Sequence, residues 1–193
     1  MKLFGSYTSP FVRHCRIAVL ETRAECEFVE SDSAVSAVRS PTKRLPFLED
    51  GELLLTDSAS IIRYLRERAG QPFLPDVRAL DRFCLVDTAL GAAVNLFVLE
   101  RDGITPEQSP YLKRERARID TCLRTLEADA PFVDGAFPVP ASAPTDDVVL
   151  RLACFLAWTQ FRRRLSLDSY PKLSALLARA QKYEPFAVTA PHD

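Results

Sequence analysis

Three short segments place hydroxyl, carboxylate and basic side chains where predicted helices and strands begin. Thr8-Ser9-Pro10-Phe11 opens one helix, Lys43-Arg44-Leu45-Pro46 leads into a strand, and Asp57-Ser58 opens a second helix. The first N–H groups of a helix have no partner within the helix and lie at the positive end of its dipole, so a helix start can bind a carboxylate. The simpler alternative is that Ser9, Asp57 and Ser58 only cap their helices, because Ser and Asp are favoured there.

The second segment belongs to a predicted β-hairpin. Two short apolar strands lie on either side of Asp50-Gly51, a turn pair that tolerates positive φ. Pro46 cannot donate to a strand ladder, so we expect it at a sheet edge. If the Leu45–Pro46 peptide bond is cis, the N–H and C=O of Leu45 turn outward and can pair with an extended peptide. A trans bond is the commoner form of an X–Pro bond.

The elements around the hairpin follow from their patterns. Residues 2–7 predict a strand, residues 10–22 a helix with proline in its first turn, and residues 26–30 a second, alternating strand. Residues 31–42 are polar, short and rich in Ser and Ala. After the hairpin, residues 58–70 have apolar side chains at helical spacing and end in glycine, which predicts a helix.

This order of strand, turn, helix, hairpin and capped helix resembles the N-terminal domain of glutathione S-transferases, a thioredoxin-like fold. Ser9-Pro10-Phe11-Val12 stands where glutaredoxins carry Cys-Pro-Tyr-Cys, and Ser-Pro-Phe is the form found in serine-type transferases. Residues 5–13 are similar to the start of small bacterial members. The chain departs from the family at residues 31–42, where the second helix looks shortened and Ser40-Pro41 replaces the usual Asn-Pro.

The resemblance implies a fold of class α+β/α with two domains. Residues 1–70 would form a thioredoxin-like, glutathione-binding domain, with a mixed four-stranded sheet, helices on both faces and a cis Leu45–Pro46 bond. Residues 71–76 contain two prolines and predict a stiff linker. Residues 77–193 would form an all-α helical bundle. Within it, the sequence predicts helices over residues 77–102, after Pro106, over 147–164 and over 170–181. After the last of these we expect Phe186 to fold back and the tail beyond it to be loose.

The resemblance also implies a site for glutathione, an extended tripeptide with a thiol, an ammonium and two carboxylates. The helix start at Ser58, with the Ser58 hydroxyl, would bind the γ-glutamyl carboxylate, and Asp57 would pair with the ammonium. Leu45 would pair through its backbone with the cysteinyl unit, a small case of β-augmentation. The glycyl carboxylate would be bound by one of two basic residues, Lys43 or Arg44.

Ser9 is the candidate catalytic residue. Its hydroxyl would donate a hydrogen bond to the glutathione sulfur; this bond and the helix dipole both favour the nucleophilic thiolate by lowering the pKa of the thiol. Tyr7 and Thr8 are rival hydroxyls, since other transferases use a tyrosine near the end of this strand, although we expect Tyr7 to pack. A second pocket, between the domains, would hold a small hydrophobic electrophile and be lined by Phe11, Leu96, Phe97 and Arg101.

Composition limits the partners and the location. The 193 residues carry 25 basic and 26 acidic side chains, so there is no general attraction to nucleic acid or to an anionic membrane. Neither a signal peptide nor a membrane span is predicted. The five cysteines are scattered and never form Cys-x-x-Cys, which favours a cytoplasmic location over a disulfide framework. The two histidines, His14 and His192, are far apart, so we expect no metal site.

The predicted function is that of a glutathione S-transferase, with glutathione as co-substrate and a small hydrophobic electrophile as second substrate. Two alternatives stay open. One is a glutathione-binding or interaction module of the same fold with little activity. The other is a glutathione-dependent reductase or thiol transferase, which would need a cysteine where Ser9 or Val12 stands. Family members usually pair the N-terminal domain of one subunit with the α-domain of another, so the resemblance also implies a homodimer.

Overall fold

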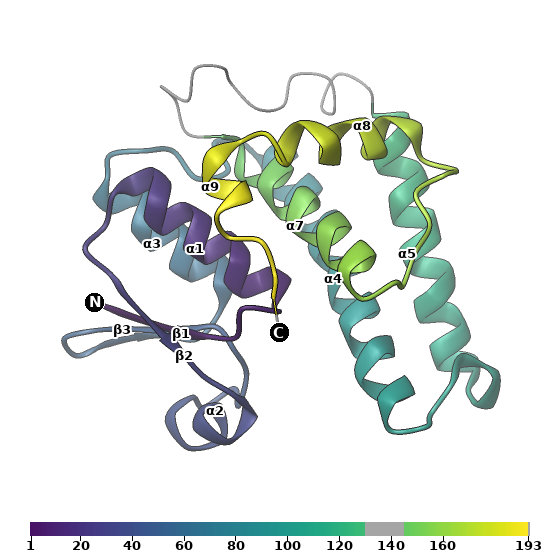
Figure 1. Ribbon diagram of the computed structural model, residues 1–193, viewed down its shortest axis with the longest axis horizontal. Helices are drawn as coiled ribbons and strands as arrows, with labels where there is room; N and C mark the ends of the chain where they lie inside the picture. The colour runs from purple at the N-terminus through teal and green to yellow at the C-terminus, as the bar shows by residue number, and fades with distance from the viewer. Residues whose placement is uncertain (130–144, 193) are drawn as a thin grey trace. The chain divides into compact units, whose positions relative to one another are not determined.

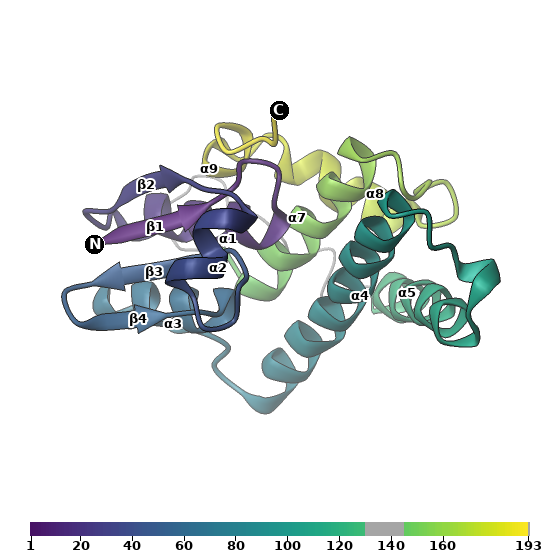
Figure 2. The same cartoon turned by 90° about the horizontal axis from the view of Figure 1, so that it is seen from below.

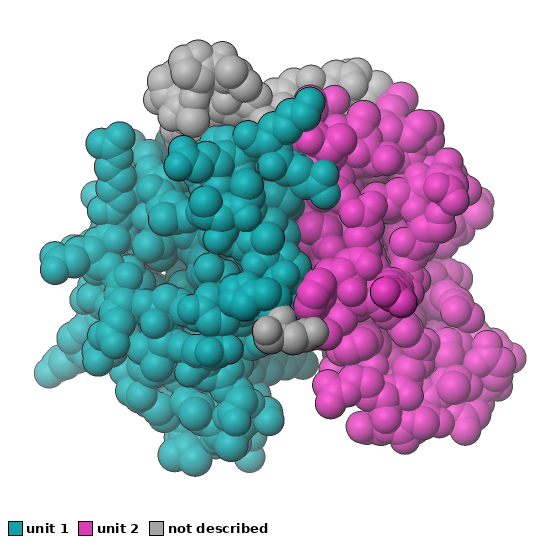
Figure 3. All heavy atoms as spheres, in the orientation of Figure 1, with its two compact units in different colours: residues 1–73, 137–145, 180–193 teal, residues 74–136, 146–179 magenta. Residues whose placement is uncertain are grey.

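The computed structural model describes residues 1–129 and 145–192. These residues group into two compact units (Figure 3): residues 1–73, 145 and 180–192 form the first, and residues 74–129 and 146–179 form the second. The boundary after residue 73 falls within the predicted linker. Residues 180–192 group with the first unit, whereas the sequence analysis placed them in the C-terminal domain.

The first unit is built on a four-stranded mixed sheet with the order β2-β1-β3-β4 (Figure 2). β1 (Lys2–Gly5) is parallel to β2 (Glu27–Glu30) and antiparallel to β3 (Phe47–Asp50). β3 in turn is antiparallel to β4 (Leu53–Leu55). This topology confirms the thioredoxin-like sheet that the resemblance implied, with β1 as a central strand.

Alternate residues of β1 and β3 face different helices, because successive side chains of a strand point to opposite faces of a sheet. Leu3 and Leu48 belong to a buried core with residues of α1 (Pro10–Thr22) and α3 (Ser58–Arg68). On the other face, the rings of Phe4 and Phe47 stack with centroids 4.4 Å apart, and the Arg39 guanidinium of α2 (Ser33–Arg39) lies 4.3 Å from the Phe4 centroid. Helices therefore cover both faces, as predicted (Figure 1).

The hairpin forms as predicted, with its turn shifted by one residue. Asp50 still pairs with Leu53, so the two-residue turn is Gly51-Glu52 rather than Asp50-Gly51. Gly51 has a positive φ of 61°, a conformation that glycine adopts without steric cost. The shortened second helix is present as α2, whose seven residues are capped by the Asp32 carboxylate.

The second unit is helical, as predicted. Its helices are α4 (Val77–Arg101), α5 (Pro110–Ala128), α7 (Asp147–Phe161) and α8 (Pro171–Ala180), with a 3₁₀ helix, η1 (Pro106–Gln108), before α5. By length and composition alone, α4 could cross a membrane, a test that core helices of soluble proteins also pass. α4 packs against α5 and α7, and its Leu90 is fully buried, which accounts for its apolar character.

The C-terminal segment packs along α1 (Figure 1), both at Phe186, which the sequence predicted to fold back, and beyond it, where the sequence predicted a loose tail. α9 (Glu184–Ala187) places the Phe186 ring 3.6 Å from the guanidinium carbon of Arg13, and Arg13 donates a hydrogen bond to the Phe186 carbonyl oxygen at 2.6 Å. Further along the segment, the His192 ring lies 4.4 Å from the Tyr7 ring. The expectation of a loose tail was therefore wrong for the described residues.

A buried ion pair fixes the far end of α1. The Arg66 guanidinium, fully buried, pairs with the Glu21 carboxylate and also donates to the Gln71 side chain at 2.9 Å. Tyr183 donates its hydroxyl to Glu21 at 2.5 Å, and the Thr145 N–H donates to it at 3.2 Å. Burial, and then the bond to Glu21, raise the pKa of Tyr183. The buried charges are thus paired and hydrogen-bonded, as stability requires.

Candidate functional site

Four chain segments meet at one edge of the sheet in the first unit. β1 and β2 are parallel and both end at this edge, whereas β3 begins there and β4 ends there, because each is antiparallel to its neighbour. The loops at this edge are those that carry Ser9, Leu45 and Asp57, the residues singled out from the sequence. Ser6 and Leu45 line one cavity, so the first two loops lie together.

Ser9 caps α1 and keeps its hydroxyl proton available. The Ser9 Oγ accepts a hydrogen bond from the Val12 N–H at 3.4 Å, and its hydroxyl finds no acceptor among the described residues. A serine hydroxyl has one proton to donate besides its lone pairs, so capping and donation use different parts of the same group. The two roles considered for Ser9, helix cap and thiol donor, are therefore compatible.

The two rival hydroxyls lie in different surroundings. The Thr8 Oγ1 is 3.0 Å from the Ser6 Oγ, so these two hydroxyls pair with each other. The Tyr7 ring packs against Phe28 at 4.9 Å between centroids, in addition to its contact with His192. The expected packing of Tyr7 is confirmed, and Ser9 is left as the hydroxyl at the start of α1.

Leu45 presents a free backbone at the start of β3. Its bond to Pro46 is cis, as the resemblance implied. Leu45 is half-buried, and its N–H and C=O have no hydrogen-bond partner among residues 1–129 and 145–192. It lines a cavity of about 550 Å³ whose other walls are Ser6, Glu30, Ser31, Asp32, Ser33 and Val35. These other cavity residues were not predicted from the sequence, although the pairing of β2 with β1 places the residues after Glu30 at this edge.

The charged candidates at this edge are exposed. Asp57 caps α3 by accepting the Ala59 N–H at 2.8 Å, and it forms no ion pair with any described cation. Lys43 and Arg44 are likewise exposed, without an ion pair to a described acid. Ser58 is buried, and its carbonyl oxygen accepts a hydrogen bond from the Cys15 thiol at 3.7 Å, which ties α1 to the start of α3. This edge therefore offers both an acid for an ammonium and bases for a carboxylate.

The residues predicted to line an electrophile pocket belong to both units. Phe11 lies in α1 of the first unit, whereas Leu96, Phe97 and Arg101 lie on α4 of the second. Leu96 is buried, and the Phe97 ring meets the Trp158 ring edge-on at 5.6 Å. The Arg101 guanidinium lies 5.9 Å from the Phe97 centroid. Their assignment to one pocket stays a prediction.

The histidines and cysteines form no metal centre in the described part of the chain. Among residues 1–129 and 145–192, no group of three or more His, Cys, Asp or Glu side chains could hold a metal ion. His14 is fully buried within α1. His192 lies against Tyr7 instead of near other metal-binding side chains.

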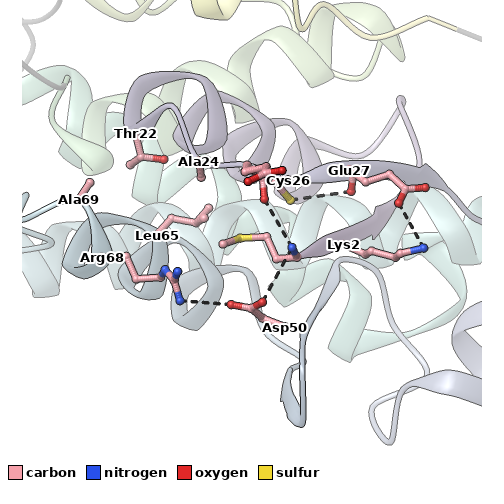
Figure 4. A pocket seen from close by; sticks show the side chains of 11 residues that line it. Lys2, Thr22, Ala24, Cys26, Glu27, Asp50, Leu65, Arg68 and Ala69 are labelled. Carbon is pink, nitrogen blue, oxygen red and sulfur yellow. Dashed lines mark hydrogen bonds and ion pairs between the residues drawn. The ribbon is translucent and has the colours of Figure 1, made fainter.

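A larger cavity lies at the opposite end of β1 (Figure 4). It has a volume of about 800 Å³, and much of its wall is charged. Most of these charges pair with one another: the Met1 ammonium with Asp50 at 3.8 Å, Lys2 with Glu27 at 3.2 Å, and Arg68 with Asp50 at 3.3 Å, whereas the exposed Glu25 carboxylate lies outside these pairs. Because each cation of this wall is already paired, little is left to bind an anionic ligand, so we do not place the functional site here.

Comparison with known proteins identifies the family of this chain. The family described as glutathione S-transferase, N-terminal domain, matches residues 3–73. The GST-like protein YibF of Escherichia coli (strain K12) is 31% identical, over 99% of this chain and 98% of its own length. A probable maleylacetoacetate isomerase of Vibrio cholerae is 29% identical, over 99% and 95%.

Solved structures agree with the sequence relatives. The crystal structure of a glutathione S-transferase from Methylobacillus flagellatus, with glutathione bound, covers 99% of this chain and 99% of its own at a TM-score of 0.81 and 25% identity. The fold and these relatives agree with one another. This chain belongs to the glutathione S-transferase family.

Proposed function

We propose that the protein is a glutathione S-transferase that activates the glutathione thiol through Ser9 and joins the sulfur to a small hydrophobic electrophile. The observation that carries the proposal is the Ser9 hydroxyl, which is held by the Val12 N–H at the start of α1 and has no acceptor among the described residues. A hydroxyl bond to the sulfur favours the thiolate, and the dipole of α1 acts in the same direction. Since the thiolate is the nucleophile, more thiolate at neutral pH means faster attack.

In this proposal glutathione lies along the edge of the sheet. The free backbone of Leu45 suits the cysteinyl unit, because an extended peptide can add to an unpaired strand end. The start of α3 at Ser58 suits the γ-glutamyl carboxylate, and the exposed Asp57 suits the ammonium. Lys43 and Arg44 are the candidates for the glycyl carboxylate. All of these residues belong to the first unit.

Titration calorimetry with glutathione and with S-methylglutathione tests the proposal. Glutathione should release a proton on binding near neutral pH, because its thiol ionises, whereas S-methylglutathione has no thiol proton to release. Titrations in two buffers of different ionisation enthalpy give the proton count. Binding of glutathione without proton release would leave only a glutathione-binding module. Failure of both ligands to bind would remove the site altogether.

A second candidate is glutathione-dependent isomerisation, favoured by the relative named a probable maleylacetoacetate isomerase. A thiolate that adds to an activated cis double bond allows rotation about the resulting single bond, and its departure regenerates glutathione. The same Ser9 would serve both reactions, because both begin with the thiolate. Consumption of glutathione distinguishes them: conjugation uses one molecule per turnover, and isomerisation uses none.

The family resemblance supports two further parts of the proposal, a homodimer and a cytoplasmic location. Dimers of this family pair unlike domains across a two-fold axis, so each subunit would contribute the same surfaces. Sedimentation at micromolar concentration is expected to give the mass of two chains. A mass of one chain under those conditions would contradict the dimer without touching the glutathione site, all of whose proposed residues come from one subunit.

A further inference from the structure

The first unit contains another cavity, away from the residues proposed to bind glutathione. It has a volume of about 290 Å³ and lies among β1, α1, β2 and the segment after α9. Its wall is mostly apolar and includes Val19, Leu20, Phe28 and Val188. Leu20 is 45% exposed and Val188 is 62% exposed, so apolar surface continues outward at the mouth of the cavity.

Among the residues that the structure describes, Arg16 is the one charged side chain that lines this cavity. Its guanidinium carbon lies 4.6 Å from the Tyr7 ring centroid and 5.1 Å from that of Phe28. It forms no ion pair with any acid in residues 1–129 and 145–192, and its buried Nη1 has no hydrogen-bond partner there. Burial lowers the pKa of Arg16, with a smaller opposite effect from Tyr7, as expected for a charge that lacks a compensating anion.

Two buried arginines of the same unit, in contrast, have oxygen partners. Arg66 pairs with the Glu21 carboxylate, and Arg13 donates to the Phe186 carbonyl oxygen at 2.6 Å. Arg16 is half-buried, and removing its Nη1 from water without an oxygen partner is unfavourable. A carboxylate is the anion whose planar geometry fits a guanidinium best. The cavity at Arg16 thus combines an apolar wall with a cation whose natural partner is missing from the described chain.

We propose that this cavity binds a small amphiphilic carboxylate, with its hydrocarbon chain against Val19, Leu20, Phe28 and Val188 and its carboxylate on Arg16. The volume lies near the lower end of the range for ligand pockets, about 300 to 1,000 Å³, so a short-chain acid fits better than a long one. None of these residues is among those proposed to bind glutathione. The ligand therefore binds together with glutathione and is not displaced by it.

Octanoate and octanol form a matched pair of probes, because they share a chain and differ in charge. The full-length protein, saturated with S-methylglutathione, is titrated with each by calorimetry. Octanoate should bind at one site per chain, about tenfold more tightly than octanol, since hydrogen bonds to charged groups are the stronger ones. Arg16→Gln should remove that advantage and leave octanol binding unchanged. Arg16→Lys should restore part of it.

Two controls keep the proposal open to refutation. Arg63→Gln removes an exposed arginine of α3 that pairs with Glu67, and it should leave both affinities unchanged. If Arg16→Gln fails to fold, the matched variants Leu20→Glu and Leu20→Gln replace it, because Leu20 is one helical turn from Arg16 and partly exposed. Glu at that position should abolish octanoate binding by pairing with Arg16, and Gln should weaken it less.

Three results would overturn the proposal. Octanoate could bind no more tightly than octanol, or equally well to Arg16→Gln, and in either case Arg16 would not be the anion partner. Octanoate binding that is lost when S-methylglutathione is present would place it in the glutathione site. Equal effects of Leu20→Glu and Leu20→Gln would show that only space, and not charge, matters at this cavity.

Discussion

The two ends of the sheet in the first unit both carry polar cavities, but they use their charges differently. At the Met1 end, the Met1 ammonium and Arg68 both lie within 3.8 Å of Asp50. At the Ser9 end, the Ser9 hydroxyl proton and the Leu45 backbone have no partner within the described chain. The Met1 cavity is the larger, at about 800 Å³ against about 550 Å³. The contrast indicates that unsatisfied groups, and not volume, mark the end that receives a ligand.

The Met1 end also lies next to the most deeply buried charges of the unit. Leu65 and Arg68 line its cavity, and Arg66 between them in α3 pairs with Glu21 inside the unit. Polar groups at this end therefore stabilise the folded unit. If the contrast is right, substitutions at the Met1 end change stability and spare glutathione chemistry. Substitutions at the Ser9 end should change glutathione chemistry, and they should change stability only where they remove a helix cap.

Arg66→Met should have the largest effect on stability. The substitution leaves the Glu21 carboxylate, whose side chain is only 3% exposed, without its cation. Breaking a buried ion pair in this way costs about 3–5 kcal/mol in the free energy of unfolding. Urea denaturation measures the change. Arg63→Met, which breaks the exposed pair with Glu67, is the control and should change the free energy by about 0–1 kcal/mol.

Glutathione affinity of the folded Arg66→Met variant should equal that of the parent protein at a temperature where both are folded. An affinity that falls in step with stability would show that the two ends of the sheet are coupled. Equal losses of stability in Arg66→Met and Arg63→Met would show that burial does not distinguish the two pairs.

Ser9→Ala should cut turnover at neutral pH by about ten- to hundredfold, because a hydrogen bond to a charged acceptor contributes about 1.5–3 kcal/mol. Binding of glutathione should change little, since Leu45, Asp57 and Ser58 hold its other groups. The pKa of the bound thiol, followed by thiolate absorbance, should rise by about one to two units. Ser9→Cys should instead shift the protein towards mixed-disulfide chemistry, because a cysteine at a helix start has a lowered pKa.

The cap of α1 must be separated from the chemistry of Ser9. Alanine at an N-cap costs about 0.5–2 kcal/mol of stability, whereas glycine costs only a few tenths. Ser9→Gly and Ser9→Ala should therefore lose turnover equally and stability unequally, while Ser9→Thr keeps both functions. If Tyr7→Phe abolishes turnover and Ser9→Ala does not, the tyrosine is the activating hydroxyl.

Asp57→Asn isolates the charge at the start of α3. Asparagine caps a helix about as well as aspartate, so the bond to the Ala59 N–H and the stability should be kept. The loss of the ion pair with the glutathione ammonium should raise the KM for glutathione by up to about fivefold, the upper range for exposed pairs near 1 kcal/mol, with kcat unchanged. Raising the ionic strength should reduce the difference, because salt screens exposed charges. An unchanged KM would leave Asp57 as a cap alone.

Much of the fold was predictable because its signals are local. Helix α1 begins after Ser9 and runs from Pro10 to Thr22, as the cap and the apolar spacing indicate. The start of α3 at Asp57-Ser58 follows from the same rule. The thioredoxin-like topology and the cis Leu45–Pro46 bond came instead from the family resemblance, since no local pattern of this chain requires them.

The features of the fold and of the sites that could not be predicted depend on contacts between residues far apart in the chain. Arg13 and Phe186 are 173 residues apart, and although we expected Phe186 to fold back, nothing near it in the sequence indicates that its partner is Arg13 of α1. The cavity at Arg16 could not be predicted from the sequence either. Arg16 follows the ordinary residue spacing of a helix, and the residues around it come from three other segments. Ser31 and Asp32 reach the Ser9 edge only through the pairing of β2 with β1.

Asp50→Asn should have the smallest effect, and that effect should depend on pH. Tyr64 donates its hydroxyl to Asp50 at 2.6 Å, and this bond, with the nearby Met1 ammonium and Arg68, lowers the pKa of the carboxyl. A carboxyl whose pKa is lower in the folded state contributes stability above its unfolded pKa, about 3.9, and loses it as the pH falls through the folded value. The parent protein should therefore be slightly more stable than Asp50→Asn near neutral pH, with the difference vanishing in acid.

Urea denaturation of both proteins from about pH 3 to pH 7 measures this difference. Salt should reduce it at neutral pH, because the Asp50 side chain is partly exposed, at 26%, and its interactions with its cation partners are screened. The kcat/KM for glutathione should be the same in both proteins at each pH, since Asp50 lies at the end of the sheet that satisfies its own charges. A difference in stability that grows as the pH falls would reverse the assigned direction of the pKa. A loss of kcat/KM would place Asp50 in the glutathione chemistry and end the distinction between the two ends.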